Sequence, residues 1–201
     1  MVYLKTKRVI DLVFSVLAAV ILSPVFFILF IAIKLETPGP IFFKQKRVGI
    51  NKTHFNILKF RTMRIDTPKD TPTHLLDNPD QYITRVGKFL RKTSLDELPQ
   101  IFNIIKGEMA IIGPRPALWN QYDLIEERDK YSANDVRPGL TGWAQINGRD
   151  ELSVKVKANF DGQYIQEMSF IMDIRCFVGT IFSVLMRDGI VEGGNGVGLD
   201  L

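Results

Sequence analysis

The N-terminal part of the chain is dominated by one long apolar run. No charged residue occurs from Leu12 to Ile33. These 22 residues, at about 1.5 Å of helix per residue, are long enough to cross a hydrocarbon core of roughly 30 Å. Pro24 lies inside the run, where it supplies no N–H to the carbonyl of Val20 and clashes with it. The pattern therefore predicts a membrane helix that is broken at Ser23-Pro24.

Basic residues flank this apolar run on both sides. Lys5, Lys7 and Arg8 precede it, and Lys34, Lys44, Lys46 and Arg47 follow it. Basic residues beside a membrane segment favour the cytoplasmic side. A helix that enters the membrane, turns at Ser23-Pro24 and leaves on the same face satisfies both flanks. These residues favour a re-entrant segment, and a kinked spanning helix remains the alternative.

Beyond residue 36 the pattern predicts short strands and amphipathic helices. Alternating apolar residues predict a β-hairpin over residues 41–63, and three prolines among polar residues predict a surface loop over 66–81. Helices are predicted over 82–92, from about Asp96 to Lys106, where apolar residues share one face, and in two stretches of 151–187 that separate near Ser169. Residues 119–131 are predicted to form a polar helix. Residues 107–120 are apolar with a Pro-rich turn, and residues 135–149 are expected to form a Gly-rich loop.

The fold predicted from these elements is of the α+β class and mainly helical. It combines the re-entrant membrane helix of residues 1–36 with a small β-hairpin and with amphipathic helices that lie on the surface. Residues 37–190 are expected to form one unit continuous with the membrane segment. Residues 191–201 are rich in glycine and are expected to be a flexible tail.

Composition and charge narrow the classes of function. The chain has 201 residues, 46% of them apolar, a net charge of +4 and a mean hydropathy of +0.05. Residues 1–35 hold four basic residues and one acidic residue, so a net charge of only +1 remains on the other 166. A unit so close to neutral argues against a nucleic-acid partner. The single cysteine, Cys176, excludes an internal disulfide and favours a reducing compartment.

Two adjacent carboxylates, Asp96 and Glu97, lie just ahead of a predicted helix. Ser94 and Glu97 have the spacing of a capping box, but that register puts Pro99 inside the helix. A helix that begins at Leu95 or Asp96 instead places both carboxylates at its positive end, where they stay ionised. From these residues, a helix cap, a metal site and a nucleophile that attacks phosphorus all remain open.

Conformationally restricted arginines accompany this acidic pair. Arg115 stands between two prolines, and Arg137 is followed by Pro138 and Gly139, so both backbones have few accessible conformations. Arginine binds phosphate oxygens through two parallel N–H donors. Each arginine alone is most often a surface ion pair. As a set beside two carboxylates in a near-neutral unit, they favour a diphosphate substrate.

Other common site chemistries find little support in the sequence. His54, His74 and Cys176 do not have the spacing of zinc ligands, and a Ser-His nucleophile would have to recruit one of these two turn histidines. The sequence contains neither a phosphate-binding loop of the Walker type nor a G-x-G-x-x-G motif.

Several motifs, taken together and in this order, resemble those of a known family. They are Lys7-Arg-Val-Ile-Asp11, Ser23-Pro24, Gln45-Lys-Arg-Val-Gly49, Lys59-Phe-Arg-Thr-Met63, Ser94-Leu-Asp-Glu-Leu-Pro-Gln100, Gly113-Pro-Arg-Pro116 and the run from Arg137 to Arg149. With these motifs, the chain resembles the bacterial sugar transferases, the monotopic phosphoglycosyl transferases, from about Lys7 to Arg187. It is similar to the minimal form of that family, without additional N-terminal membrane helices.

The resemblance implies an enzyme that moves a sugar 1-phosphate from a UDP-sugar to polyprenol phosphate and releases UMP, the initiating membrane step of bacterial glycoconjugate synthesis. Asp96 would be the nucleophile and form a covalent phosphosugar intermediate. Mg²⁺ would bind at Asp96, with Glu97 as a second ligand or an orienting group. The residues implied in substrate binding are Lys59, Arg91, Arg115, Arg137, Pro138, Gly139, Gln145 and Arg149.

The resemblance also implies where such an enzyme works. A re-entrant helix broken at Ser23-Pro24 would place the catalytic unit on the cytoplasmic face of the bacterial inner membrane, in contact with membrane lipids. The sugar and the pathway stay open, and a homodimer is one expectation for the oligomeric state. The alternative is a non-catalytic module, in which Asp96 and Glu97 cap a helix and the arginines bind anionic lipid head groups.

Overall fold

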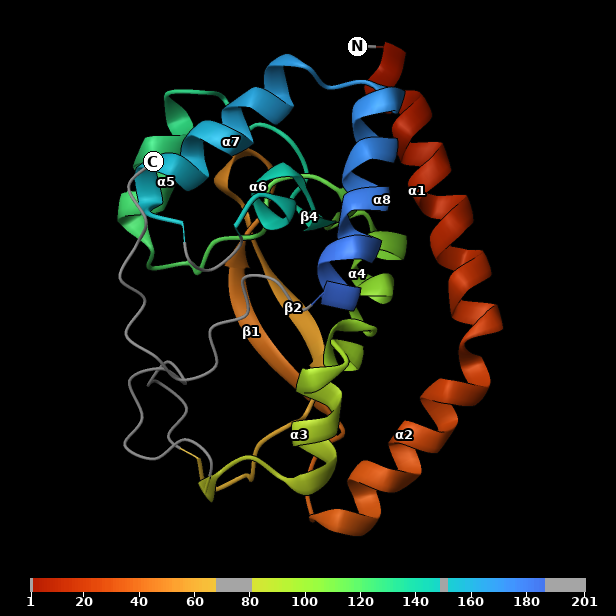
Figure 1. Cartoon of the computed structure of the whole chain (residues 1–201). Coiled ribbons are helices and arrows are strands. Elements are labelled where there is room, and N and C mark those ends of the chain that lie inside the picture. Colours follow the sequence, from red (N-terminus) through yellow and green to blue (C-terminus); the bar gives the residue numbers. More distant parts are fainter. Residues whose placement is uncertain (1, 68–80, 149–151, 187–201) are drawn as a thin grey trace.

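The computed structural model describes residues 2–67, 81–148 and 152–186. It is mainly helical, and a bent pair of N-terminal helices, α1 and α2, runs along one side of the molecule (Figure 1). The helices are α1 (Val2–Ile21), α2 (Ser23–Glu36), α3 (Arg85–Lys92), α4 (Gln100–Lys106), α5 (Tyr122–Asp129), α6 (Trp143–Ile146), α7 (Val154–Gln166) and α8 (Phe170–Met186). The strands are β1 (Phe42–Val48), β2 (His54–Phe60), β3 (Ala110–Ile112) and β4 (Gly139–Thr141), and the short 3-10 turns are η1 (Ile50–Lys52) and η4 (Leu95–Glu97).

The break at Ser23-Pro24 is confirmed. Helices α1 and α2 meet at an angle of 60°, and Pro24 lies in the first turn of α2, where its missing N–H costs no helical hydrogen bond. The Ser23 hydroxyl donates to the carbonyl of Val20 at 2.8 Å. Within the described residues, neither helix by itself meets the length and hydropathy needed to cross a bilayer, whereas the bent pair together does.

The bent pair has one packed face and one bare apolar face. On the packed face, Phe26, Leu29 and Ile33 form a core cluster with Phe60 of β2 and Leu90 of α3. The opposite face leaves large apolar side chains exposed, among them Val13, Phe14, Leu17, Val20, Ile21, Phe27, Ile28, Ile31 and Leu35. An exposed apolar surface of this extent is typical of a membrane or protein contact.

The N-terminal end of α1 is attached to the body through buried polar contacts. Lys7 Nζ lies 2.6 Å from Asp173 Oδ2 of α8, and the Tyr3 hydroxyl donates to the same oxygen at 2.7 Å. Arg8 donates to the carbonyls of Ile104 and Ile105 at the end of α4. Consistent with this, α8 and α4 both lie beside α1 in Figure 1.

The C-terminal end of α2 is held by two sets of side chain to backbone hydrogen bonds. Arg61, just after β2, donates to the carbonyls of Thr37 and Pro38 at 2.7 Å each, and so covers carbonyl groups that follow the last turn. In return, the Glu36 carboxylate accepts the backbone N–H groups of Arg85 and Val86 at 2.6 and 3.0 Å, at the start of α3. The exit of α2 is thus joined to both the hairpin and α3.

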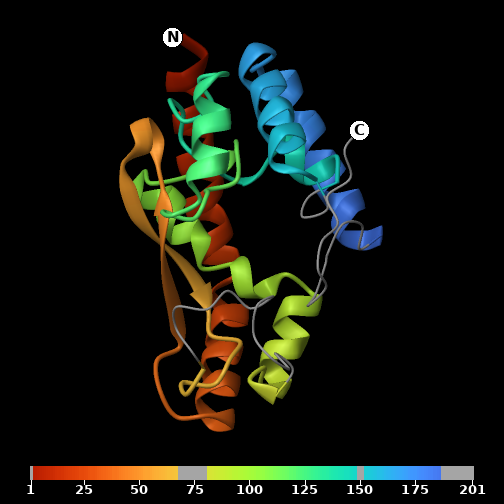
Figure 2. The same ribbon diagram turned by 90° about the vertical axis from the view of Figure 1, so that its left-hand side faces the viewer.

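The predicted hairpin is confirmed as an antiparallel pair of β1 and β2, in which Lys59 lies opposite Phe43 and Arg47 opposite Phe55. It forms one edge of the molecule in Figure 2. The continuous helix predicted from Asp96 to Lys106 is wrong. Pro99 separates the η4 turn from α4, which begins at Gln100, because a proline ring cannot sit inside a helical ladder.

The Gly-rich segment 135–149 is more ordered than the sequence suggests. It contains β4, which pairs in parallel with β3, followed by α6. A Cβ atom on Gly139 would come within 2.2 Å of the Gly113 backbone nitrogen, so the absence of side chains allows the close approach of these two segments. Arg149, the tail 191–201 and most of the predicted loop 66–81 lie outside the described residues.

Candidate active site

The acidic pair lies on the η4 turn between α3 and α4. Ser94, which precedes the turn, has a left-handed backbone with φ of 55° and makes no side-chain capping bond. Its hydroxyl therefore does not form the capping box that the spacing allows. The turn instead directs Asp96 and Glu97 toward cations from other elements.

Glu97 is held by two cations. Lys59 of β2 donates to its Oε1 at 2.9 Å. Arg115 donates to both carboxylate oxygens in a fork, with Nη1 at 3.2 Å from Oε2. Burial opposes ionisation, but the charges and hydrogen bonds of Arg115 and Lys59 outweigh it and hold the pKa of Glu97 well below its usual range.

Asp96 has a different environment, although it is the preceding residue. Its Oδ2 lies 3.9 Å from Lys59 Nζ, and within residues 2–67, 81–148 and 152–186 its carboxylate accepts no side-chain hydrogen bond. Burial raises the pKa of Asp96, Lys59 lowers it and the negative charge of Glu97 raises it further, with a net upward shift. The result is a largely buried carboxylate to which no described side chain donates a hydrogen bond.

Three elements supply the cations that act on Asp96. These are Lys59 of β2, Arg91 of α3 and Arg115 of the loop after β3. Arg91 is oriented by a hydrogen bond of 3.0 Å from its Nε to the Thr62 hydroxyl. Helix α3 can approach Thr62 this closely because Gly87 has no side chain. A Cβ atom at Gly87 would lie only 2.0 Å from the Thr62 carbonyl oxygen. Thr62 was missed by the sequence interpretation, although it lies inside the matching motif that starts at Lys59.

Arg137 lies at the opposite end of α4 from the acidic pair. Its Nε donates to the carbonyl of Gly107 at 2.9 Å, and Gly107 is the C-cap of this seven-residue helix. Asp96 precedes the start of α4, and seven helical residues span about 10 Å. The structure thus groups Lys59, Arg91 and Arg115 with Asp96 and places Arg137 elsewhere.

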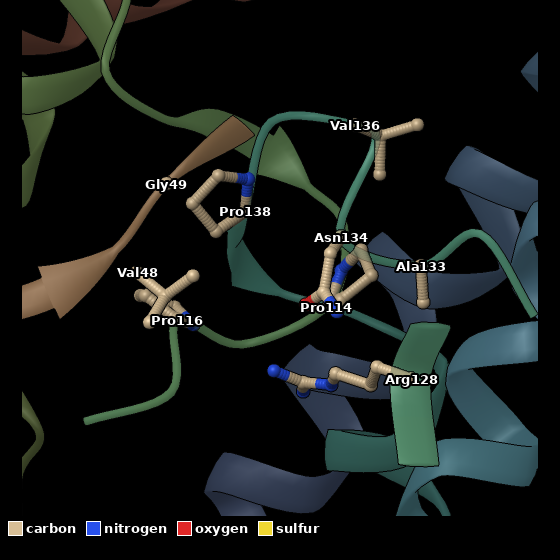
Figure 3. Close-up of a pocket in the computed structure, with 9 residues that line it drawn as sticks. All are labelled: Val48, Gly49, Pro114, Pro116, Arg128, Ala133, Asn134, Val136 and Pro138. Carbon is tan, nitrogen blue, oxygen red and sulfur yellow. The ribbon is translucent and has the colours of Figure 1, made fainter. Parts of the chain in front are cut away.

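The other predicted substrate residues are structural neighbours of the Pro-Arg-Pro loop. The backbone N–H of Gly139 donates to the carbonyl of Pro114 at 2.8 Å. Gln145 is buried, and within the described residues its Oε1 has no hydrogen-bond partner. Pro138 lines a hollow together with Pro114 and Pro116 (Figure 3).

This hollow lies against the Pro-Arg-Pro loop, and neither residue of the acidic pair lines it. The empty space inside it, including the part open to solvent, is about 220 Å³. Arg128 of α5 extends toward it in Figure 3 and is fixed by a 2.7 Å hydrogen bond to Asp161 of α7. We infer that the hollow is part of the packing behind Arg115, since neither Asp96 nor Glu97 lines it.

The donor set at the acidic pair fits a hard cation such as Mg²⁺ only in part. The described residues contain no group of three or more His, Cys, Asp or Glu side chains able to hold a metal. Glu97 is already engaged by Arg115 and Lys59, which leaves Asp96 as the available carboxylate. Mg²⁺ is commonly bound by one or two carboxylates together with substrate phosphates and water, and this site is compatible with that arrangement.

Comparison with known proteins shows the family of the chain. The family model of the bacterial sugar transferases matches residues 2–187. The chain belongs to the bacterial sugar transferase family. Among the curated relatives, an uncharacterized sugar transferase, EpsL, of Bacillus subtilis is 37% identical over 92% of this chain and 90% of its own. The exopolysaccharide production protein ExoY of Sinorhizobium fredii is 36% identical over 92% of this chain and 87% of its own.

Longer relatives of this sugar transferase have names that state a reaction. The UDP-glucose:undecaprenyl-phosphate glucose-1-phosphate transferase of Escherichia coli is 40% identical over 88% of this chain, which corresponds to 39% of that protein. The chain therefore spans nearly the full length of some relatives and about two fifths of others.

Proposed function

We propose that this sugar transferase moves a sugar 1-phosphate from a UDP-sugar to polyprenol phosphate, as the names of its longer relatives state for undecaprenyl phosphate. The observation that carries the proposal is the difference between the two neighbouring carboxylates. Glu97 holds Lys59 and Arg115 in place, and Asp96 stands beside the same cations without a strong donor on its oxygens. That division suits one structural carboxylate and one reactive carboxylate.

The reaction proceeds in two displacements in this proposal. A carboxylate oxygen of Asp96 bonds to the β-phosphorus of the UDP-sugar, and the bond from that phosphorus to the bridging oxygen breaks, so UMP leaves with the electron pair. An oxygen of polyprenol phosphate then attacks the same phosphorus and releases the Asp96 carboxylate. Covalent catalysis of this kind divides one difficult transfer into two easier steps.

The cations make an attack by one anion on another feasible. Lys59, Arg91 and Arg115 all act electrostatically on Asp96, and such fixed charges stabilise the negative charge of a phosphoryl transition state. Mg²⁺, bound through Asp96 and the diphosphate, would supply further charge neutralisation. The raised pKa of Asp96 makes its carboxylate more basic, and a more basic oxygen is a stronger nucleophile.

We also propose that the bent pair of α1 and α2 is a re-entrant membrane element. Its bare apolar face, its 60° bend and the basic residues on both flanks support an entry into and exit from the same face of the inner membrane. A catalytic unit on the cytoplasmic face can meet both a soluble nucleotide sugar and a membrane-bound lipid phosphate.

Trapping the intermediate tests the proposed function most directly. Purified chain in lipid, given Mg²⁺ and each UDP-sugar of a panel without acceptor, is expected to gain one sugar phosphate on the peptide that contains Asp96, as detected by mass spectrometry. Asp96→Asn should abolish the adduct and UMP release, while Asp129→Asn, at an exposed ion pair, should leave both intact. Lipid binding without UMP release from any UDP-sugar would instead support a non-catalytic module.

A further inference from the structure

Arg47 of β1 lies on the same face of the hairpin as Lys59. Lys59 is paired with Phe43, and opposite residues in a pair of strands project to one face. Residues 43, 45 and 47 alternate with their neighbours onto that face. Arg47 thus projects from the face that carries Lys59, about 13 Å along the strand from Phe43.

The Arg47 side chain is fixed against the loop that presents Arg115. Its Nη1 donates to the carbonyl of Pro116 at 3.0 Å, and its Nη2 donates to Gln45 Oε1 at 2.6 Å. Its Nε is shielded from solvent and has no hydrogen-bond partner within the described residues. A guanidinium with an unused buried donor is a costly arrangement unless an acceptor arrives.

The charges around Arg47 are unbalanced. Burial and the neighbouring Arg115 guanidinium lower the pKa of Arg47 to about 10, against a smaller opposing effect of Glu97. The group therefore stays protonated at neutral pH beside a second guanidinium. Glu97, the acidic group that acts on Arg47, already binds Arg115 and Lys59, so the two guanidiniums form a setting that favours an added anion.

The positions of these cations indicate how a bound diphosphate would be oriented. Lys59 lies 3.9 Å from Asp96, whereas Arg47 is four residues along β1 from Phe43, the strand partner of Lys59, and donates to the carbonyl of Pro116, next to Arg115. Arg47 therefore lies farther along the hairpin from Asp96 than Lys59 does, beside the loop that carries Arg115. A diphosphate whose reacting phosphorus meets Asp96 would extend its second phosphate toward Arg115 and Arg47.

We propose that Arg47 is a substrate-binding residue that contacts the nucleotide-side phosphate of the sugar donor. This rests on the proposed function. It orients the donor so that the sugar phosphate faces Asp96 and the departing nucleoside monophosphate faces the hairpin. The role differs from that of Lys59 and Arg91, which face the transferred phosphate.

A comparison of UMP binding with UDP binding distinguishes the two phosphate positions. UMP has only the nucleotide-side phosphate, whereas UDP has both. On the full chain in lipid nanodiscs, we expect Arg47→Gln to weaken UMP and UDP binding by about tenfold or more, since each charge-assisted hydrogen bond contributes about one or two powers of ten. Arg91→Gln should weaken UDP binding and leave UMP binding within about twofold. Lys44→Gln, at an exposed residue on the opposite face of the same strand, is the matched control and should change neither.

Uridine, which has no phosphate, distinguishes direct contact from support of the loop. If Arg47→Gln weakens uridine and UMP equally, or leaves UMP binding unchanged, the proposed phosphate contact is refuted. Unchanged uridine binding together with weakened UMP binding supports it. A wild-type chain that binds no UMP at all would overturn the proposed function itself, whatever the variant does.

Discussion

Asp96 and Glu97 are consecutive carboxylates whose pKa values are displaced in opposite directions. Burial acts on both, but Glu97 receives hydrogen bonds from Lys59 and Arg115, whereas Asp96 lies 3.9 Å from Lys59. The pKa of Glu97 is therefore lowered and that of Asp96 raised. The negative charge that Glu97 keeps at all ordinary pH values is one cause of the raised pKa of its neighbour.

The two carboxylates should affect stability with opposite signs. Glu97→Gln is expected to lower the free energy of unfolding by about 1–3 kcal/mol, because it leaves Arg115 and Lys59 without their common acceptor. Asp96→Asn is expected to stabilise the protein by up to about 1 kcal/mol, because it removes a buried charge that the fold disfavours. Thermal unfolding in the same detergent at pH 7 compares them, and a lower Tm for both would contradict the assignment of roles.

The pH dependence of stability should follow Glu97. A carboxyl with a lowered pKa stabilises the fold above its unfolded-state pKa, and this stabilisation is lost as pH falls through the lower folded-state pKa. The wild-type chain is therefore expected to lose more stability than Glu97→Gln between pH 5 and the acid limit of folding, as measured by denaturant unfolding at each pH. Equal slopes for the two proteins would show that Glu97 is not the group responsible.

The pH dependence of turnover should follow Asp96. The nucleophile must be ionised, so kcat/KM for UMP release is expected to fall on the acid side at a pH above the ordinary range of an aspartate. Lys59→Gln should move this limb to still higher pH, since Lys59 lowers the pKa of Asp96. The position of the limb, and not the height of the profile, is the measurement. If the acid limb of Lys59→Gln lies at the same pH as that of the wild type, the limb does not report an Asp96 carboxylate whose pKa depends on Lys59.

Glu36 is expected to act on the site through α3. Its carboxylate accepts two N–H groups at the start of this helix, and Arg91 lies in the last turn. Glu36→Gln removes the charge that favours a helix N-terminus and should cost about 0.5–2 kcal/mol. We expect kcat/KM to fall by about three- to tenfold because Arg91 is less well positioned.

A double-mutant cycle separates this positioning effect from a general loss of stability. If Glu36 acts through Arg91, Glu36→Gln should have little further effect on kcat/KM in an Arg91→Gln background. Additive effects in the cycle would argue against positioning. Glu126→Gln, on the exposed side of α5, is the control and should change neither activity nor Tm.

The re-entrant topology predicts that both flanks of the bent pair face the cytoplasm. In a Cys176→Ala background, single cysteines are placed at the exposed residues Lys5 and Lys44. Both are expected to react with a membrane-impermeant thiol reagent only when the cytoplasmic side is accessible, in inverted vesicles but not in intact spheroplasts. Reaction of the two cysteines from opposite sides would establish a spanning helix instead.

The parts of the fold that could be predicted from the sequence are those set by local chemistry. Pro24 predicts the bend because a proline ring disrupts a helix wherever it occurs in the interior. The same argument applies to Pro99: the predicted start at Leu95 or Asp96 still left this proline inside the helix, whereas α4 begins after it, at Gln100. The hairpin follows from short-range alternation and was predicted.

The parts that could not be predicted depend on contacts distant in sequence. Arg115 and Arg137 both stand beside prolines in similar motifs, yet one binds Glu97 and the other binds the carbonyl of Gly107. The pairing of β3 with β4 places one of these motifs against the other. Each of these strands has only three residues, which is too short for the sequence pattern to predict the pairing. Arg47 lies inside the matching motif Gln45-Lys-Arg-Val-Gly49, but its contact with the loop that carries Arg115 could not be read from that motif.

The contacts of Asp173 with Lys7 and Tyr3 set an order of events during synthesis of the chain. Lys7 and Tyr3 of α1 are made before α8, but their partner Asp173 follows 166 and 170 residues later. Domains generally begin to fold from the N-terminus as they emerge, so Lys7 has only Asp11 of the same helix, 3.8 Å away, as an ion-pair partner until α8 is made. The attachment of α1 to the body of the molecule is therefore completed only after α8 has been synthesised.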